Sequence, residues 1–164
     1  MMVTETHTTV ETLYELHATE LVRFATSLVG PHDAADLVST VFVTALGGSS
    51  LESAADPRAY LYRSVLNASH SESRSSARRN RREEHVASHD RVGQAVLNSA
   101  AADTDVWAAL SDLSERQRAV AYLTYWLDLT PDAVAEMLDI STGSVKKHLD
   151  RARKSLRNSL GGHS

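Results

Sequence analysis

LSERQRAVAYLTYWLDLTPDAVAEMLDISTGSVKKHLDRARKSLR, residues 113–157, contains three helix starts in close succession. Ser114 and Gln117 have the spacing of a capping box, in which the serine side chain accepts a hydrogen bond from one exposed backbone N–H and the glutamine reaches back to another. Thr130 stands before a proline, and Ser141 follows a short turn, so each can cap a further helix. Two helices joined by a tight turn, after a capped first helix, predict a helix-turn-helix.

The last of these helices has one apolar stripe and is otherwise basic. Four apolar residues recur at helical spacing and are predicted to be buried, namely Val145, Leu149, Ala152 and Leu156. Short side chains in the first turn leave backbone N–H groups open to a phosphate or a base edge, and the cations beyond them suit phosphates on either side of a major groove. The predicted contacts with duplex DNA are Thr142, Gly143, Ser144, Lys146, Lys147, Arg151, Arg153 and Lys154. The alternative is a surface helix that is basic for solubility.

The first half of the chain also shows helical periodicity. Apolar spacing predicts a helix over 10–29 that ends at Gly30-Pro31, and a second helix from Asp33 onward. Asp56, directly before a proline, predicts the start of a third helix that runs on into a stretch rich in arginine.

Residues 83–104 are small, polar and charged, without a sustained amphipathic pattern, and are predicted to form a linker. The sequence therefore predicts an all-α fold of two small helical domains joined by a flexible linker. The predicted boundaries are 1–82 for the first domain, 83–104 for the linker and 105–164 for the domain with the helix-turn-helix.

Charge alternates in blocks along the chain, although the formal net charge is −4. Residues 61–82 hold 6 bases and 1 acid, as do residues 142–164, and the rest of the chain is acidic. Two basic blocks in an acidic chain indicate two separate contacts with a polyanion. The chain has no cysteine, no secretory signal pattern and no long apolar run, so we expect a cytoplasmic protein without membrane insertion.

Catalytic motifs are missing from the sequence. It has no phosphate-binding glycine loop, no HExxH and no G-x-S-x-G, so we expect neither an enzyme nor a cofactor. His85 and His89 are spaced as two ligands on one helical face, but they stand in the predicted linker, and no metal site is predicted.

Residues 113–157 resemble the C-terminal promoter-binding domain of bacterial RNA polymerase sigma factors of the extracytoplasmic-function group, in the sigma-70 family. LYELHATELVRFATSLVGPHDAADLVSTVF, followed by DPRAYLYRSVLN and the arginine run, is similar to the other sigma domain. The resemblance implies a factor that directs RNA polymerase to specific promoters, with the polymerase core and promoter DNA as partners. It leaves open an anti-sigma factor as a further partner.

The resemblance also implies roles for particular residues. The helix-turn-helix would read the minus-thirty-five element. Melting and capture of the minus-ten element would involve Tyr60, Arg63, Asn67, Arg74, Arg78 and Arg79. Contact with the polymerase core, through its β′ and β subunits, would involve Asp36, Leu37, Val38, Val41 and Phe42, although a buried core stripe is an equal alternative for Leu37, Val41 and Phe42.

Three positions depart from the family pattern. Ser39-Thr40 stands where a Gln-Glu pair is usual, Ser71 where an Asp is common, and Asp139 where the turn often has Gly. Two other functions stay open at this point. One is a free-standing dimeric helix-turn-helix regulator that does not join polymerase, and the other is a protein that titrates a partner such as an anti-sigma factor.

Overall fold

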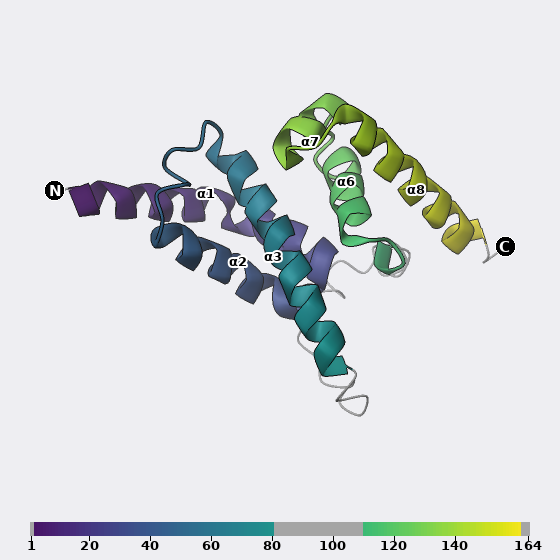
Figure 1. Cartoon of the computed structure of the whole chain (residues 1–164), viewed down its shortest axis with the longest axis horizontal. Helices are drawn as coiled ribbons and strands as arrows, with labels where there is room; N and C mark the ends of the chain where they lie inside the picture. The colour runs from purple at the N-terminus through teal and green to yellow at the C-terminus, as the bar shows by residue number, and fades with distance from the viewer. Residues whose placement is uncertain (1, 81–109, 162–164) are drawn as a thin grey trace.

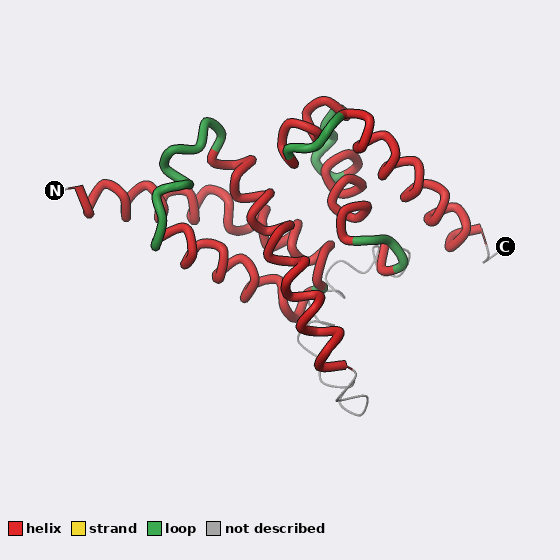
Figure 2. The backbone as a smooth tube through the Cα atoms, viewed as in Figure 1, coloured by secondary structure: helices red, strands yellow, loops and turns green. Residues whose placement is uncertain are grey.

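The computed structural model describes residues 2–80 and 110–161. Within these ranges the regular structure is entirely helical (Figure 2). The helices are α1 (Met2–Val29), α2 (Pro31–Leu46), α3 (Pro57–Asn80), α6 (Glu115–Tyr125), α7 (Pro131–Leu138) and α8 (Thr142–Gly161). The predicted all-α class is confirmed, and the predicted linker lies outside the described residues.

Helices α1, α2 and α3 pack together as the first unit (Figure 1). α1 passes into α2 through Gly30 alone, whose φ of 88° suits glycine and would strain other residues. Pro31 then occupies the first position of α2, where its missing N–H leaves no intrahelical bond unmade. The predicted stop at this pair is confirmed, although α1 starts before residue 10 and α2 starts two residues before Asp33.

The start of α3 is capped as the sequence predicts. The backbone N–H of Ala59 donates to Asp56 Oδ1 at 3.2 Å, and Pro57 is the first helical residue. The buried side of α3 packs on α1, and Tyr62 and Phe24, whose ring centroids are 4.8 Å apart, are both fully buried. This pair anchors the core of the first unit.

Helices α6, α7 and α8 form the second unit, and all three predicted caps are present. Ser114 and Gln117 make both bonds of the capping box, at 3.1 and 3.2 Å. Thr130 Oγ1 accepts from a backbone N–H of α7 at 3.2 Å, and Ser141 Oγ accepts from one of α8 at 3.1 Å. Because each cap satisfies a backbone N–H that the helix itself leaves unpaired, the local sequence defines these three starts.

The turn between α7 and α8 depends on Asp139, which adopts the left-handed conformation with φ 55° and ψ 49°. The next residue, Ile140, donates its N–H to the carbonyl of Ala135 at 3.0 Å and so closes the end of α7. Aspartate is among the few residues other than glycine that enter this region readily. The helix-turn-helix is therefore formed with aspartate at a position that also suits glycine.

The two units pack directly against each other (Figure 1). α6 contacts α1 and α3, and α7 contacts α3, so that buried apolar residues of both units join one continuous core. The sequence pattern predicted two domains and a linker but no interface between the domains. No helix among the described residues has the length and apolar character needed to span a bilayer.

Candidate nucleic-acid interface

The outer face of α8 carries a row of cations. Lys147, Arg151 and Lys154 follow one another at i, i+4 and i+7, and all three are exposed. The opposite side is the core stripe, in which the predicted burial is confirmed for Val145, Leu149 and Ala152, while Leu156 is only partly buried. The apolar stripe fixes the orientation of the helix and leaves the cations directed at solvent.

The first turn of α8 uses its hydroxyl groups internally. Thr142 Oγ1 donates to Asp132 Oδ1 of α7 at 3.0 Å, and Ser141 Oγ donates to Ser144 Oγ at 3.0 Å. The first bond joins α8 to α7, and the second lies within the start of α8. Gly143 is exposed beside them, so the part of this turn that is open to a ligand is the backbone around Gly143.

Two more predicted cations lie on the flank of α8. Lys146 is exposed. Arg153 donates from Nε to the hydroxyl of Tyr125 at 2.7 Å, and this bond raises the pKa of Arg153 above its ordinary value. Arg153 is thereby held against the end of α6, whereas Lys147, Arg151 and Lys154 have no such tether among the described contacts.

A histidine interrupts the basic helix on its partly buried side. Burial lowers the pKa of His148 below its ordinary value, and the positive charges of Arg116 and Arg151 lower it further. Its Nδ1 atom is buried without a hydrogen-bond partner. Burial and the neighbouring cations therefore both favour the neutral form of His148.

Two of the residues predicted to contact the minus-ten element lie on α3 at the boundary between the two units. Arg63 and Asn67 are one turn apart and line a cleft of about 310 Å³ together with Arg116, Asp139 and Ile140 of the second unit. Arg63 Nη1 lies 3.9 Å from Asp139 Oδ2, and the Nε atom of Arg63 is buried without a partner. Two of the predicted minus-ten residues thus face the second unit.

The other predicted minus-ten residues are Tyr60, Arg74, Arg78 and Arg79. Tyr60 is partly buried and packs at the edge of the core. The three arginines belong to the last turns of α3, and their side chains lie outside the described part of the structure.

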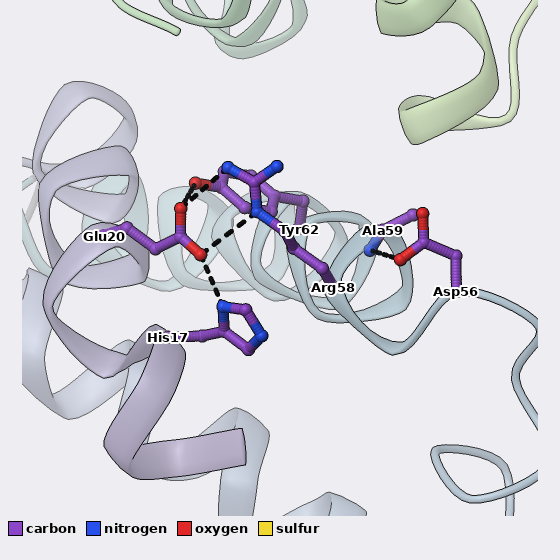
Figure 3. Close-up of polar contacts among 6 residues, drawn as sticks. All are labelled: His17, Glu20, Asp56, Arg58, Ala59 and Tyr62. Carbon is purple, nitrogen blue, oxygen red and sulfur yellow. Dashed lines mark hydrogen bonds and ion pairs between the residues drawn. The ribbon is translucent and has the colours of Figure 1, made fainter. Parts of the chain in front are cut away.

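A polar cluster that the sequence did not predict joins α1 to α3 (Figure 3). Glu20 accepts two hydrogen bonds from Arg58, at 3.1 and 2.9 Å, and one from the hydroxyl of Tyr62 at 3.0 Å. His17 Nδ1 lies 2.6 Å from the same carboxylate. In the sequence His17 stands among apolar neighbours, and only its spacing of three from Glu20 points to this contact.

The cluster controls the ionisation of its members. Burial alone would raise the pKa of Glu20, but the hydrogen bonds from Arg58, His17 and Tyr62 outweigh it and hold the pKa below its ordinary value. Burial and the nearby Glu20 carboxylate raise the pKa of Tyr62. The cluster is a fixed ionised link that holds α3 at its position on α1.

Helix α2 exposes a different face from the one predicted to contact polymerase. Four of the five predicted residues are buried in the first unit, namely Leu37, Val38, Val41 and Phe42. Their side chains pack against α1 instead, as in the contact between Phe42 and Tyr14, whose ring centroids are 5.0 Å apart. Of the five, Asp36 alone is exposed, and its outward neighbours on the helix are Ser39, Thr40 and Val43.

Metal binding has no support in the described residues, where no three His, Cys, Asp or Glu side chains are grouped to hold an ion. His85 and His89 lie outside them.

The comparisons with known proteins match both units of the chain. Residues 13–79 match the family model for sigma-70 region 2, and residues 104–156 match the model for sigma-70 region 4. The RNA polymerase sigma-E factor of Streptomyces avermitilis is 33% identical over 147 residues, which cover 85% of this chain and 78% of that protein. The fold resembles that of the sigma factor RpoE from Bartonella quintana, solved in complex with the anti-sigma factor NepR, with a TM-score of 0.67 and 22% identity over 92% of this chain and 96% of that one.

The helix-turn-helix, the second basic helix and these matches define a DNA-binding subunit of the transcription initiation machinery. The chain belongs to the sigma-70 family, as a sigma factor of the extracytoplasmic-function group. It directs initiation by RNA polymerase at specific promoters. The resemblance found in the sequence is confirmed, and the regulator that acts without polymerase is set aside.

Proposed function

We propose a division of labour among three helices of this sigma factor. α8 reads the minus-thirty-five element as duplex, α3 captures the minus-ten element as a single strand, and α2 docks on the β′ subunit of the polymerase core. The domain boundaries that go with this assignment are 1–82, 83–104 and 105–164.

The exposed cationic row of α8 is the observation that carries the proposal. Its three members, Lys147, Arg151 and Lys154, lie opposite the buried stripe, so they can reach phosphates while the helix stays packed in its unit. The backbone around Gly143, at the N-terminal end, is suited to enter the major groove first. Thr142, Ser144 and Arg153 contribute by holding this surface in position, since each is engaged within the unit.

The role of α3 rests on residue chemistry and on its place in the unit. Arg63 and Asn67 are spaced to contact one strand from one side of the helix, and the arginines after Ser73 extend the positive charge along it. Bases that leave the duplex need such a surface of hydrogen-bonding and cationic groups. The Glu20 cluster supports this function indirectly because it keeps α3 in register on α1.

The contact with polymerase is proposed for the exposed face of α2. Asp36, Ser39, Thr40 and Val43 form this face, which offers one carboxylate, two hydroxyls and one apolar side chain. Thr40 Oγ1 donates to the carbonyl of Asp36 at 2.9 Å, so that hydroxyl is partly engaged within the helix. The buried residues of α2 contribute only by holding this face in position. We further propose that the second unit, which matches sigma-70 region 4, contacts the β subunit of polymerase.

The solved neighbour from Bartonella quintana is bound to an anti-sigma factor, and we propose a regulator of that kind for this chain as well. Polymerase performs the nucleotidyl transfer, so the chain acts by binding and not as an enzyme. Its place of action is the cytoplasm, where the polymerase works.

Transcription reconstituted from bacterial core RNA polymerase and a promoter library tests the proposal. With the chain present, we expect new start sites, each preceded by two shared sequence elements at a fixed spacing. Co-purification with polymerase and no new start sites would contradict the assignment of promoter recognition to this chain.

Charge reversal on α8 tests the reader helix itself. Lys147→Glu or Arg151→Glu is expected to weaken binding to the minus-thirty-five duplex and to lower the slope of log affinity against log salt by about 1, because one phosphate contact is lost. Arg157→Glu, with the same charge change near the C-terminal end of the same helix, is the matched control and should have little effect. Binding to core polymerase should not change. Equal loss in all three variants would indicate a general charge effect and not a reader helix.

A further inference from the structure

We propose that the cleft lined by α3 and the second unit is a binding site for a small phosphate ester of about the size of a mononucleotide. Its volume is about 310 Å³, at the lower end of the range of about 300–1,000 Å³ in which proteins hold small ligands. The site depends only on the residues of the cleft, whereas its effect on strand capture rests on the proposed function of α3.

The side of the cleft formed by α3 carries a guanidinium whose hydrogen bonding is incomplete. Arg63 Nε is buried and has no hydrogen-bond partner. Arg63 Nη1 lies 3.9 Å from Asp139 Oδ2, which is too long for a hydrogen bond, and water screens the pair because the Asp139 side chain is 83% exposed. A buried donor without a partner is unusual in a folded protein. An anion in the cleft would supply the missing acceptor.

The second unit adds another guanidinium to the lining. Arg116 lies in the first turn of α6, is exposed, and forms no ion pair within residues 2–80 and 110–161. Its charge acts on its surroundings, since burial lowers the pKa of His148 and the charge of Arg116 lowers it further. Two guanidinium groups in the lining of one cleft suit a phosphate group, whose oxygens accept several charge-assisted hydrogen bonds at once.

The remaining lining is mostly apolar and favours an ester over a bare ion. Leu66 of α3, Leu138 of α7 and Ile140 of the following turn supply this apolar surface. Such a surface contributes little to the binding of inorganic phosphate, but it favours burial of the flat organic part of a mononucleotide. Asn67, which is exposed at the side of α3, adds an amide that can bond to a base or to a ribose hydroxyl.

A single carboxylate opposes the binding of an anion. Asp139 is the only acid among the residues that line the cleft, against the two arginines. The cleft is therefore positive, although the formal net charge of the chain is −4. Repulsion from Asp139 weakens the binding of a phosphate ester, so removal of this charge should strengthen it.

A bound phosphate ester would also affect strand capture. It uses Arg63 and Asn67, which are proposed to contact the minus-ten strand, so ligand and strand compete for the same groups. Because Arg116 belongs to the second unit, the ligand also stabilises the arrangement in which this residue and Arg63 line one cleft.

Isothermal titration calorimetry of the full chain with adenosine 5′-monophosphate (AMP) tests the site, and inorganic phosphate and adenosine serve as the two partial probes. Arg63→Gln and Arg116→Gln are each expected to weaken AMP binding about tenfold, because each removes charge-assisted hydrogen bonds. Arg157→Gln removes an exposed cation outside the cleft and is the matched control, which should bind AMP like the wild type. Asp139→Asn should bind AMP more tightly, since asparagine keeps the left-handed backbone and removes the repulsion.

We expect AMP to bind at one site per chain, about tenfold more tightly than inorganic phosphate or adenosine. No binding of AMP at millimolar concentration would overturn the proposal. Equal affinity for AMP and adenosine, or for AMP and inorganic phosphate, would overturn it as well. An equal loss in Arg157→Gln would indicate non-specific attraction of an anion and not a site. Arg116 is exposed, so Arg116→Gln keeps the test decisive even if Arg63→Gln fails to fold.

Failure of the proposed function gives a different result, because the titration involves neither polymerase nor a promoter. If α3 does not capture a strand, a single-stranded promoter probe does not bind while AMP still does. A probe that binds to a chain without affinity for AMP would overturn this inference alone. Where both bind, AMP should displace the probe, and simultaneous binding would overturn the sharing of Arg63 and Asn67.

Discussion

Replacement of Glu20 is expected to loosen α3 from α1. In Glu20→Ala, the hydroxyl of Tyr62 loses its acceptor in a residue that is 0% exposed, which costs about 1–3 kcal/mol. The ion pair with Arg58 adds less, about 1 kcal/mol at most, because the Arg58 side chain is 38% exposed and the pair is screened by water. The free energy of unfolding should therefore fall by about 1–4 kcal/mol.

This loss is large enough to measure by urea denaturation and by thermal melting of the full chain. For a chain of 164 residues, a loss of about 3 kcal/mol corresponds to a decrease of about 10 °C in melting temperature. Glu15→Gln, in the same helix at an exposed position, is the control and should stay within about 0.5 kcal/mol of the wild type.

The loss of stability on replacement of Glu20 should also depend on pH in a defined direction. Because the pKa of Glu20 is lowered in the folded protein, the unfolded chain takes up the proton first as the pH falls. The stabilisation is thus fully present above the ordinary value of 4.5 and is lost as the pH falls through the folded pKa. The difference in stability between wild type and Glu20→Gln should shrink in acid.

Either of two results would refute this reasoning. One is a Glu20→Ala protein as stable as Glu15→Gln at neutral pH. The other is a difference between wild type and Glu20→Gln that stays constant from neutral pH into acid, since a carboxylate whose pKa is lower in the folded than in the unfolded state cannot give a flat profile.

Three further outcomes are expected in the second unit. Asp139→Gly should raise the free energy of unfolding by about 0.5–1 kcal/mol in urea denaturation, because φ at this position is 55° and glycine adopts it without strain. Ser114→Ala should lower it by about 1 kcal/mol through loss of the capping box, and Ser114→Asp should recover most of that loss in thermal melting. The pKa of His148 is lowered below 6.5 in the folded protein, so protonation in acid favours the unfolded chain. The stability that neutral His148 allows is therefore fully present above pH 6.5 and is lost as the pH falls through the folded pKa. When the pH is lowered from about 7 to about 5, the melting temperature of the wild type should therefore decrease more than that of His148→Gln.

Local rules were enough to predict the helices and the helix-turn-helix. Ser114, Thr130 and Ser141 cap the helices that their spacing predicts, because a cap satisfies backbone N–H groups of its own first turn. The buried stripe of α8, and with it the direction of Lys147 and Arg151, also follows from helical periodicity. The family resemblance rested on these same patterns and is confirmed.

Helix α2 shows what such local rules cannot predict. Apolar spacing identified one face of the helix, and a resemblance to other sigma factors assigned that face to polymerase, with burial in the core as an equal alternative for Leu37, Val41 and Phe42. The spacing alone cannot tell whether an apolar face is buried within its own unit or against a partner, and the structure shows Val41 and Phe42 packed inside the unit.

The sequence by itself determined where helices start and stop and which side of each is apolar, since both depend on residues within one or two turns of each other. Only the tertiary structure decided which distant side chains meet. Glu20 and Arg58 are 38 positions apart, and Leu28 and Arg118 are 90 positions apart. Their contacts exist because burial of apolar surface brings α3 onto α1 and α6 onto both, and polar groups taken out of water in that process must find partners there.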